Sequence, residues 1–386
     1  HLLASNTSNP KKFDVKMDLS GNDNQINADG YYSTETKVPS LNLSLNIERL
    51  NLKTIEPYTF GQVTQMSGSL KGKATISGGA DAPDITGSFQ FLSCGFRPKF
   101  LDSYLRVEDE TITLESKKVH FNSFTLVDSL DNKATLDGYA NIQDFKTIPF
   151  DLHLKTNNFL ALNTTEKDND LYFGSIYLDS DLSLKGNSNH PIINGKIGLK
   201  KGTVITYVKP ENMASQNDHK GIVEFIDTLE SQRNIMTRKK VQQEITTTKG
   251  VSLKTTINFD KDAELKMLVD RASGDSLYIK GSGQLDFTLD EGGQTSLIGK
   301  YRINDGGYHL TINDLIKKNF SIAKGSSVTW SGDVTDPFVD INAIYKIKAS
   351  PVDLVEGQLT GADQLERNKY RTLMTFLVYL KMNGFV

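Results

Sequence analysis

Residues 251–269 read VSLKTTINFDKDAELKMLV, and this stretch decides the fold. In each half, apolar or small side chains alternate with polar ones, and a short polar segment, DKD, separates the two halves. Successive side chains of a β-strand point to opposite faces of its sheet, so an alternation with period two predicts two strands. Each strand should then carry one apolar face and one polar face.

The same alternation recurs along the whole chain, for example at residues 41–47, 176–184, 193–199 and 339–347. Glycine-rich turn signals separate these runs. The spacing Gly-x4-Pro-x3-Gly begins at Gly78 and again at Gly186, and a third copy at Gly332 lacks its last glycine. Proline fits the start of a strand, where its missing N–H removes no ladder hydrogen bond. The pattern favours one sheet that keeps adding antiparallel hairpins.

Helical patterns are few and short. We expect short helices near residue 56, at 313–318 and at 221–237, and a polar loop or short helix at 363–370. The chain is therefore predicted to be all-β with few short helices. Roughly 28 strands spaced by about 4.8 Å would form a sheet on the order of 130 Å long.

Composition supports an extended shape and excludes some classes of function. The 386 residues include 44 Lys and Arg against 47 Asp and Glu, a net charge of −3, which gives no electrostatic reason to bind nucleic acid. Hydrophobic residues make up 37%, a low share that indicates much surface for little core. Cys94 is the single cysteine, so the fold cannot rest on an internal disulfide.

The sequence opens with His1, and no apolar stretch of about 18 residues follows. We therefore expect a fragment, with any signal peptide or membrane anchor upstream of residue 1.

No catalytic or metal site emerges from the motifs. The six histidines are scattered without metal-ligand spacing. Residues 293–300 resemble a phosphate loop, but five residues separate the glycines and Tyr301 replaces the required Ser or Thr. The basic cluster 238–240 is most simply a solvated face. We therefore expect no enzyme and no cofactor; a carbohydrate-acting enzyme would need two facing carboxylates, and the sequence offers no such pair.

Residues 299–345 read GKYRINDGGYHLTINDLIKKNFSIAKGSSVTWSGDVTDPFVDINAIY, and this segment resembles the signature of the TamB C-terminal domain. Upstream, residues 45–91 are similar in style to AsmA-like repeats, so the resemblance divides the chain into an AsmA-like repetitive β-trough at 1–298 and a signature region at 299–386. The second region is continuous with the trough and is expected to be truncated at its end. The matching residues are Gly307, Tyr308, Phe320, Gly325, Ser326, Trp330, Gly332, Asp333 and Pro337.

The resemblance implies a fold, a place and a task. The fold would be an elongated antiparallel sheet curled into a taco-like hydrophobic trough. The place would be the periplasm of a Gram-negative cell, with the full-length protein anchored in the inner membrane and its C-terminal end near the outer membrane. As part of a translocation and assembly module, the protein would conduct phospholipids between the membranes, assist outer-membrane protein insertion with a barrel of the TamA or BamA type, or do both. The family signature carries no catalytic residue, and phospholipid would be a transported ligand.

The apolar faces of successive strands should then line one groove for acyl chains. A secreted β-rich adhesin or surface structural protein with a closed core is the alternative, because sequence alone does not say which face is covered. The groove candidates are Leu178, Leu182, Leu184, Ile197, Leu199, Leu253, Ile257, Phe259, Leu265, Met267, Leu285, Phe287, Val339 and Ile341.

Overall fold

The computed structural model describes residues 2–6, 9–143, 147–209, 250–271, 273–312, 316–358, 361 and 364–385. The helix expected at 221–237 and the basic cluster at 238–240 lie outside these residues.

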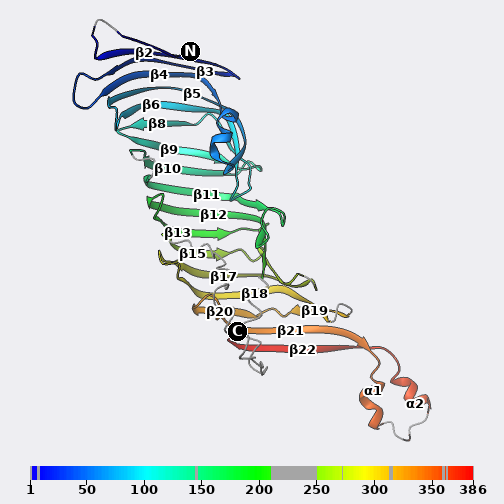
Figure 1. Cartoon of the computed structure of the whole chain (residues 1–386). Coiled ribbons are helices and arrows are strands. Elements are labelled where there is room, and N and C mark those ends of the chain that lie inside the picture. Colours follow the sequence, from blue (N-terminus) through cyan, green and yellow to red (C-terminus); the bar gives the residue numbers. More distant parts are fainter. Residues whose placement is uncertain are drawn as a thin grey trace, which may run out of the picture.

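One sheet of 22 strands contains nearly all the regular structure (Figure 1). Two 3-10 helices, η1 (Leu52–Thr54) and η2 (Glu56–Thr59), follow β4, while α1 (Val352–Val355), η4 (Glu356–Gln358) and α2 (Gln364–Lys369) connect β21 to β22. The strands are β1 (Leu2–Asn6), β2 (Lys12–Gly21), β3 (Asn24–Ser33), β4 (Ser40–Asn51), β5 (Val63–Gly79), β6 (Asp84–Pro98), β7 (Leu105–Val107), β8 (Thr111–Glu115), β9 (Lys118–Val127), β10 (Lys133–Asn141), β11 (Pro149–Thr164), β12 (Tyr172–Asn187), β13 (Pro191–Leu199), β14 (Val204–Val208), β15 (Ser252–Phe259), β16 (Glu264–Asp270), β17 (Asp275–Leu289), β18 (Thr295–Ile312), β19 (Ile316–Ile322), β20 (Ser327–Gly332), β21 (Phe338–Ala349) and β22 (Met374–Phe385).

The strands stack along the chain like the rungs of a ladder, from β1 at one end to β22 at the other (Figure 1). Four rungs consist of two strands in line, namely β7 with β8, β13 with β14, β15 with β16 and β19 with β20. The described strands therefore make 22 − 4 = 18 rungs, which at about 4.8 Å each span roughly 80 Å. The described residues hold fewer strands than the roughly 28 expected, because single strands reach 18 residues.

Short loops interrupt the divided rungs and form a corner in the sheet. The loops at 200–203, 260–263 and 323–326 each end in a small buried residue, namely Thr203, Ala263 or Ser326. Thr203 Oγ1 donates to the Tyr177 carbonyl at 3.0 Å and accepts from the Tyr177 N–H at 3.1 Å. Neighbouring continuous rungs carry register shifts instead, as between Lys280 and Gly281 in β17. Bulges bend a strand, so the rungs turn together and the sheet becomes a trough.

The sheet is mostly antiparallel, with one exception. The predicted antiparallel sheet is confirmed for most strand pairs, but β13 runs parallel to β15, and β14 runs parallel to β16.

The expected helices have mixed outcomes. Short helices are confirmed at 56–59 and 364–369. The helix expected at 313–318 was wrong from Ile316 onward, because these residues begin strand β19 and pair with β18.

Buried side chains form small clusters at the corner. One cluster joins Tyr301, Ile303 and Ile322, and another joins Leu52, Val107 and Phe124. The accessible surface of the chain is 25707 Å², against about 15,000 Å² for a compact protein of its mass. The all-β fold class is confirmed, and the described residues form one curled sheet without a second sheet to close its core.

Candidate functional site

The register of the sheet defines one continuous face, which we call the inner face. Residues paired directly across two strands lie on the same side of a sheet. Ile197 pairs with Ile257, Ile257 with Leu285, and Leu285 with Gly299. From rung to rung, the same side continues to Met17 on β2 and to Met382 on β22.

All fourteen groove candidates lie on the inner face. The sheet thus brings together residues from β12 to β21 that are up to 163 positions apart in the chain. Whether they contact lipid stays a prediction. They are Leu178, Leu182 and Leu184 on β12, Ile197 and Leu199 on β13, Leu253, Ile257 and Phe259 on β15, Leu265 and Met267 on β16, Leu285 and Phe287 on β17, and Val339 and Ile341 on β21.

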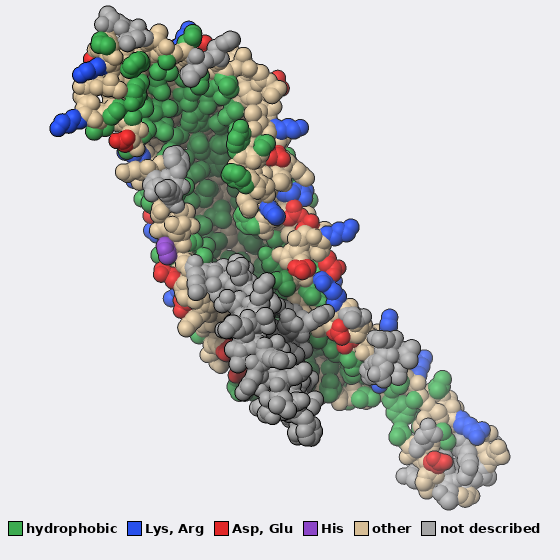
Figure 2. Space-filling view, viewed as in Figure 1, with side chains coloured by type: hydrophobic (Ala, Val, Ile, Leu, Met, Phe, Trp, Pro, Cys, Tyr) green, Lys and Arg blue, Asp and Glu red, His purple; other side chains and the backbone are tan. Residues whose placement is uncertain are grey.

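Most of these side chains are partly exposed to solvent. Leu285 is 4% exposed and Met267 is 36% exposed, and the other twelve lie between the buried and exposed classes. Figure 2 shows hydrophobic side chains gathered on the floor of a hollow along the sheet, with charged side chains at its rims. A closed core would bury such residues. The inner face is therefore the lining of an open trough.

Residues of the divided rung β15–β16 meet Tyr301 of β18 on the inner face. The ring of Tyr301 lies edge to face against Phe259, with ring centroids 5.2 Å apart, and Leu265 packs against the same cluster. Tyr301 is 2% exposed, and burial raises the pKa of its hydroxyl to about 12. The lining is therefore uncharged at this point over the whole physiological pH range.

Tyr301 and Thr255 are lining residues that the sequence analysis did not nominate. Both are buried on the inner face, and neither hydroxyl has a hydrogen-bond partner among the described residues. The alternation at 251–259 and 297–303 contained the signal for both. The groove candidates were restricted to Leu, Ile, Val, Met and Phe, and this restriction excluded Tyr301 and Thr255.

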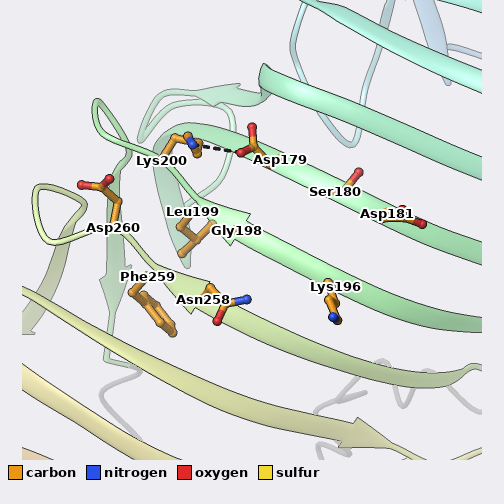
Figure 3. A pocket seen from close by; sticks show the side chains of 10 residues that line it. All are labelled: Asp179, Ser180, Asp181, Lys196, Gly198, Leu199, Lys200, Asn258, Phe259 and Asp260. Atoms are coloured by element: carbon orange, nitrogen blue, oxygen red, sulfur yellow. Dashed lines mark hydrogen bonds and ion pairs between the residues drawn. The ribbon is translucent and has the colours of Figure 1, made fainter.

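The outer face is polar and holds a shallow, charged depression (Figure 3). Lys200 Nζ lies 2.9 Å from the Asp179 carboxylate. Burial acts to raise the pKa of Asp179, but hydrogen bonds from the Asn158 N–H and from Lys200 outweigh it, so the pKa lies below its ordinary value. Lys196 lies opposite Asp181 on the same face. Among the described residues, no group of His, Cys, Asp or Glu could hold a metal ion.

The nine signature residues lie between β18 and the start of β21. Tyr308 pairs with Phe320 on the inner face, and Trp330 Nε1 donates to the Val334 carbonyl at 3.1 Å. Asp333 accepts from the N–H and hydroxyl of Thr335, which lowers the pKa of its carboxyl. The remaining signature residues lie in β18 (Gly307), in the loop between β19 and β20 (Gly325 and Ser326), at the end of β20 (Gly332) and just before β21 (Pro337).

The last strand, β22, exposes apolar side chains on both faces. Leu377 and Tyr379 point to the outer side, whereas Val378, Leu380 and Met382 continue the inner face. Tyr379 is 68% exposed. β22 pairs only with β21, so its other edge has no partner strand among the described residues.

Comparison with known proteins identifies a family, but no individual relative. In the described part of the chain, no helix is both long and apolar enough to cross a membrane. No curated protein and no solved structure matches the sequence. The model of the TamB C-terminal domain matches residues 122–386, well beyond the segment 299–386 that carried the resemblance. Since this match covers more than half of the sequence, the chain belongs to the TamB C-terminal domain family of translocation and assembly modules.

Proposed function

We propose that the chain conducts phospholipids through the periplasm, from the inner toward the outer membrane or in the reverse direction. Acyl chains lie on the inner face, and headgroups project from the open side of the trough. The observation that carries this proposal is the largely apolar face that continues from β2 to β22, on which most of the groove candidates remain partly accessible. The full-length protein is proposed to be anchored in the inner membrane.

The energetics favour such a path without any reactive group. Each CH2 moved into water costs about 0.8 kcal/mol, so a 16-carbon tail costs roughly 13 kcal/mol. Moving the same tail from a bilayer onto an equally apolar surface is nearly neutral. The trough therefore lowers the barrier by replacing one hydrocarbon environment with another.

Two hydroxyl groups on the inner face, those of Thr156 and Ser180, are hydrogen-bonded within the protein. Thr156 Oγ1 lies 3.1 Å from the Leu178 carbonyl and 3.0 Å from Ser180 Oγ, and both side chains share the inner face. A hydroxyl that already has partners gains little from a passing ester group. These residues therefore support sliding of a lipid and not its capture.

A crosslinking experiment tests the proposal directly. A photo-reactive amino acid at Ile257 of the full-length protein should capture phospholipid in cells, whereas the same group at the neighbouring Asn258 should not. Asn258 is the matched control because it lies one position away on the opposite face. Equal capture at both positions, or none at Ile257, would refute the lipid path.

A second candidate function is assistance to outer-membrane protein insertion, and β22 favours it. The free edge can pair with a strand of a TamA or BamA type barrel by β-augmentation. Leu377 and Tyr379 on the outer side would then contact apolar side chains or lipid around that barrel. A photo-crosslinker at Tyr379 should capture a barrel protein, while one at Lys346 on the neighbouring strand should capture less. Absence of any barrel adduct at Tyr379 would count against this candidate.

A further inference from the structure

One patch of the outer face departs from its polar pattern. The register places Phe173, Thr206, Lys266 and Tyr278 side by side on β12, β14, β16 and β17. His309 on β18 lies in the next row of the same face, opposite Ser276. These six residues, together with Glu264, Met267, Leu268 and Leu277, line one depression. The register places the six side chains on the outer face.

Tyr278 and His309 form an aromatic wall of this depression. Their ring planes differ by 25°, and their centroids lie 5.9 Å apart. The Tyr278 ring rests against Gly307, where an added Cβ would lie 2.7 Å from the ring atom Cε1. His309 Nδ1 lies 2.7 Å from Asn319 Oδ1, which fixes the imidazole. Both rings are thus held in place without a ligand.

The charges at the depression largely balance one another. Glu264 lies 3.0 Å from Lys266 Nζ and 3.0 Å from Lys280 Nζ. Burial acts to raise the pKa of Glu264, but hydrogen bonds from the two lysines outweigh it, so the pKa lies below its ordinary value. An anionic ligand would find both ammonium groups already engaged. An acyl chain would find its apolar path interrupted by the ion pairs.

We propose that this depression binds a pyranose ring of a neutral glycan. Such a ring has an apolar C–H face and a rim of hydroxyl groups. The wall of Tyr278 and His309 suits the C–H face, and the hydroxyls of Thr206 and Ser276 offer hydrogen bonds to the sugar hydroxyls. An aromatic surface with a few convergent polar groups is the usual composition of a small-ligand site. The site is independent of the lipid path, since it lies on the opposite face of the sheet.

Saturation-transfer NMR on the purified chain tests the proposal, with cellobiose and N,N′-diacetylchitobiose as probes. We expect saturation of the sugar ring protons and a Kd on the order of 1 mM for one of them. Tyr278→Ala should weaken binding about tenfold, which corresponds to about 1.4 kcal/mol. His309→Ala, a change at an exposed position that leaves the sheet intact, should also weaken binding.

Tyr31→Ala is the matched control, because Tyr31 lies on the outer face of the distant strand β3 and has its own cation–π partner, Lys12. This variant should bind the sugars as the original chain does. If neither sugar shows saturation transfer at a sugar concentration of about 10 mM, the proposal is overturned. Unchanged binding in both Tyr278→Ala and His309→Ala, or equal loss in Tyr31→Ala, would overturn it as well.

Discussion

Replacing Ile257 with aspartate is expected to block lipid movement along the trough. Ile257 pairs directly with Ile197 on one side and with Leu285 on the other, so the new carboxylate would stand in the middle of an apolar row. Because Ile257 is only half-buried, the carboxylate can stay ionised and hydrated within the hollow. An acyl chain would then have to pass a layer of bound water.

The size of the effect follows from the number of methylenes exposed during passage. A hydrated carboxylate spans about four CH2 groups, and each loses about 0.8 kcal/mol, so the barrier rises by about 3 kcal/mol. Since 1.36 kcal/mol is a factor of ten in rate, transfer should slow more than about 100-fold. The fold should lose only about 1–2 kcal/mol, the transfer free energy of a partly buried isoleucine.

Transfer of a fluorescent phospholipid between donor and acceptor vesicles, mediated by the purified protein, measures this rate. Asn258→Asp places the same charge one residue away on the outer face and should leave the rate unchanged. Ile257→Leu should also transfer normally. Normal transfer by Ile257→Asp, or an equal defect in Asn258→Asp, would show that the inner face is not the lipid path.

Three further predictions concern the scaffold. Asp128→Ala should lower the free energy of unfolding by about 3 kcal/mol in urea titrations, because the buried carboxylate accepts from the N–H groups of Leu130, Asn132 and Leu160 and from the Asn132 amide; an unchanged midpoint would contradict this role. The Tyr301 hydroxyl has a pKa of about 12 in the folded chain and of about 10 in the unfolded chain. Its contribution to the free energy of unfolding, about 3 kcal/mol, is therefore present below pH 10 and is lost as the pH rises to 12. In alkaline unfolding experiments the original chain should lose that stability relative to Tyr301→Phe. A Cβ at Gly195 would lie 2.0 Å from the Asp181 carbonyl oxygen, so Gly195→Ala should cost at least about 2 kcal/mol and lower Tm, whereas a small shift in Tm would mean that the strands move apart freely.

The grouping of apolar side chains on one face of each strand was predictable because the side-chain period of a strand is two, whereas which face is covered was not. Ile197, Ile257 and Leu285 lie far apart in sequence, yet local alternation made each a groove candidate, and the register places all three on one face. Once rungs stack in register, local assignments add up to one surface. The trough therefore required no long-range information beyond the stacking itself.

The direction and division of the rungs were not predictable in the same way. The DKD segment at 260–262 has the residues of a hairpin turn, but β15 and β16 continue in line along β17. Turn-forming residues predict that the backbone changes direction, but they do not predict the angle of that change. Likewise, alternation is identical for parallel and antiparallel strands, so nothing in residues 192–199 and 252–259 announced that β13 and β15 run parallel.

The site on the outer face was also invisible to sequence patterns. Phe173, Tyr278 and His309 come from three separated strands, and each alone is an unremarkable polar-side residue. Their proximity depends on the parallel placement of β14 beside β16, which brings β12 within three rungs of β17. A signal of this kind needs the register of the sheet.

The one-rung-at-a-time order of the strands makes this architecture adjustable in length. A hairpin inserted between two rungs would add about 10 Å while leaving every other contact between neighbours in place. A bridge across a compartment can therefore be matched to the width of its gap by duplicating or deleting hairpins, without redesign of either end.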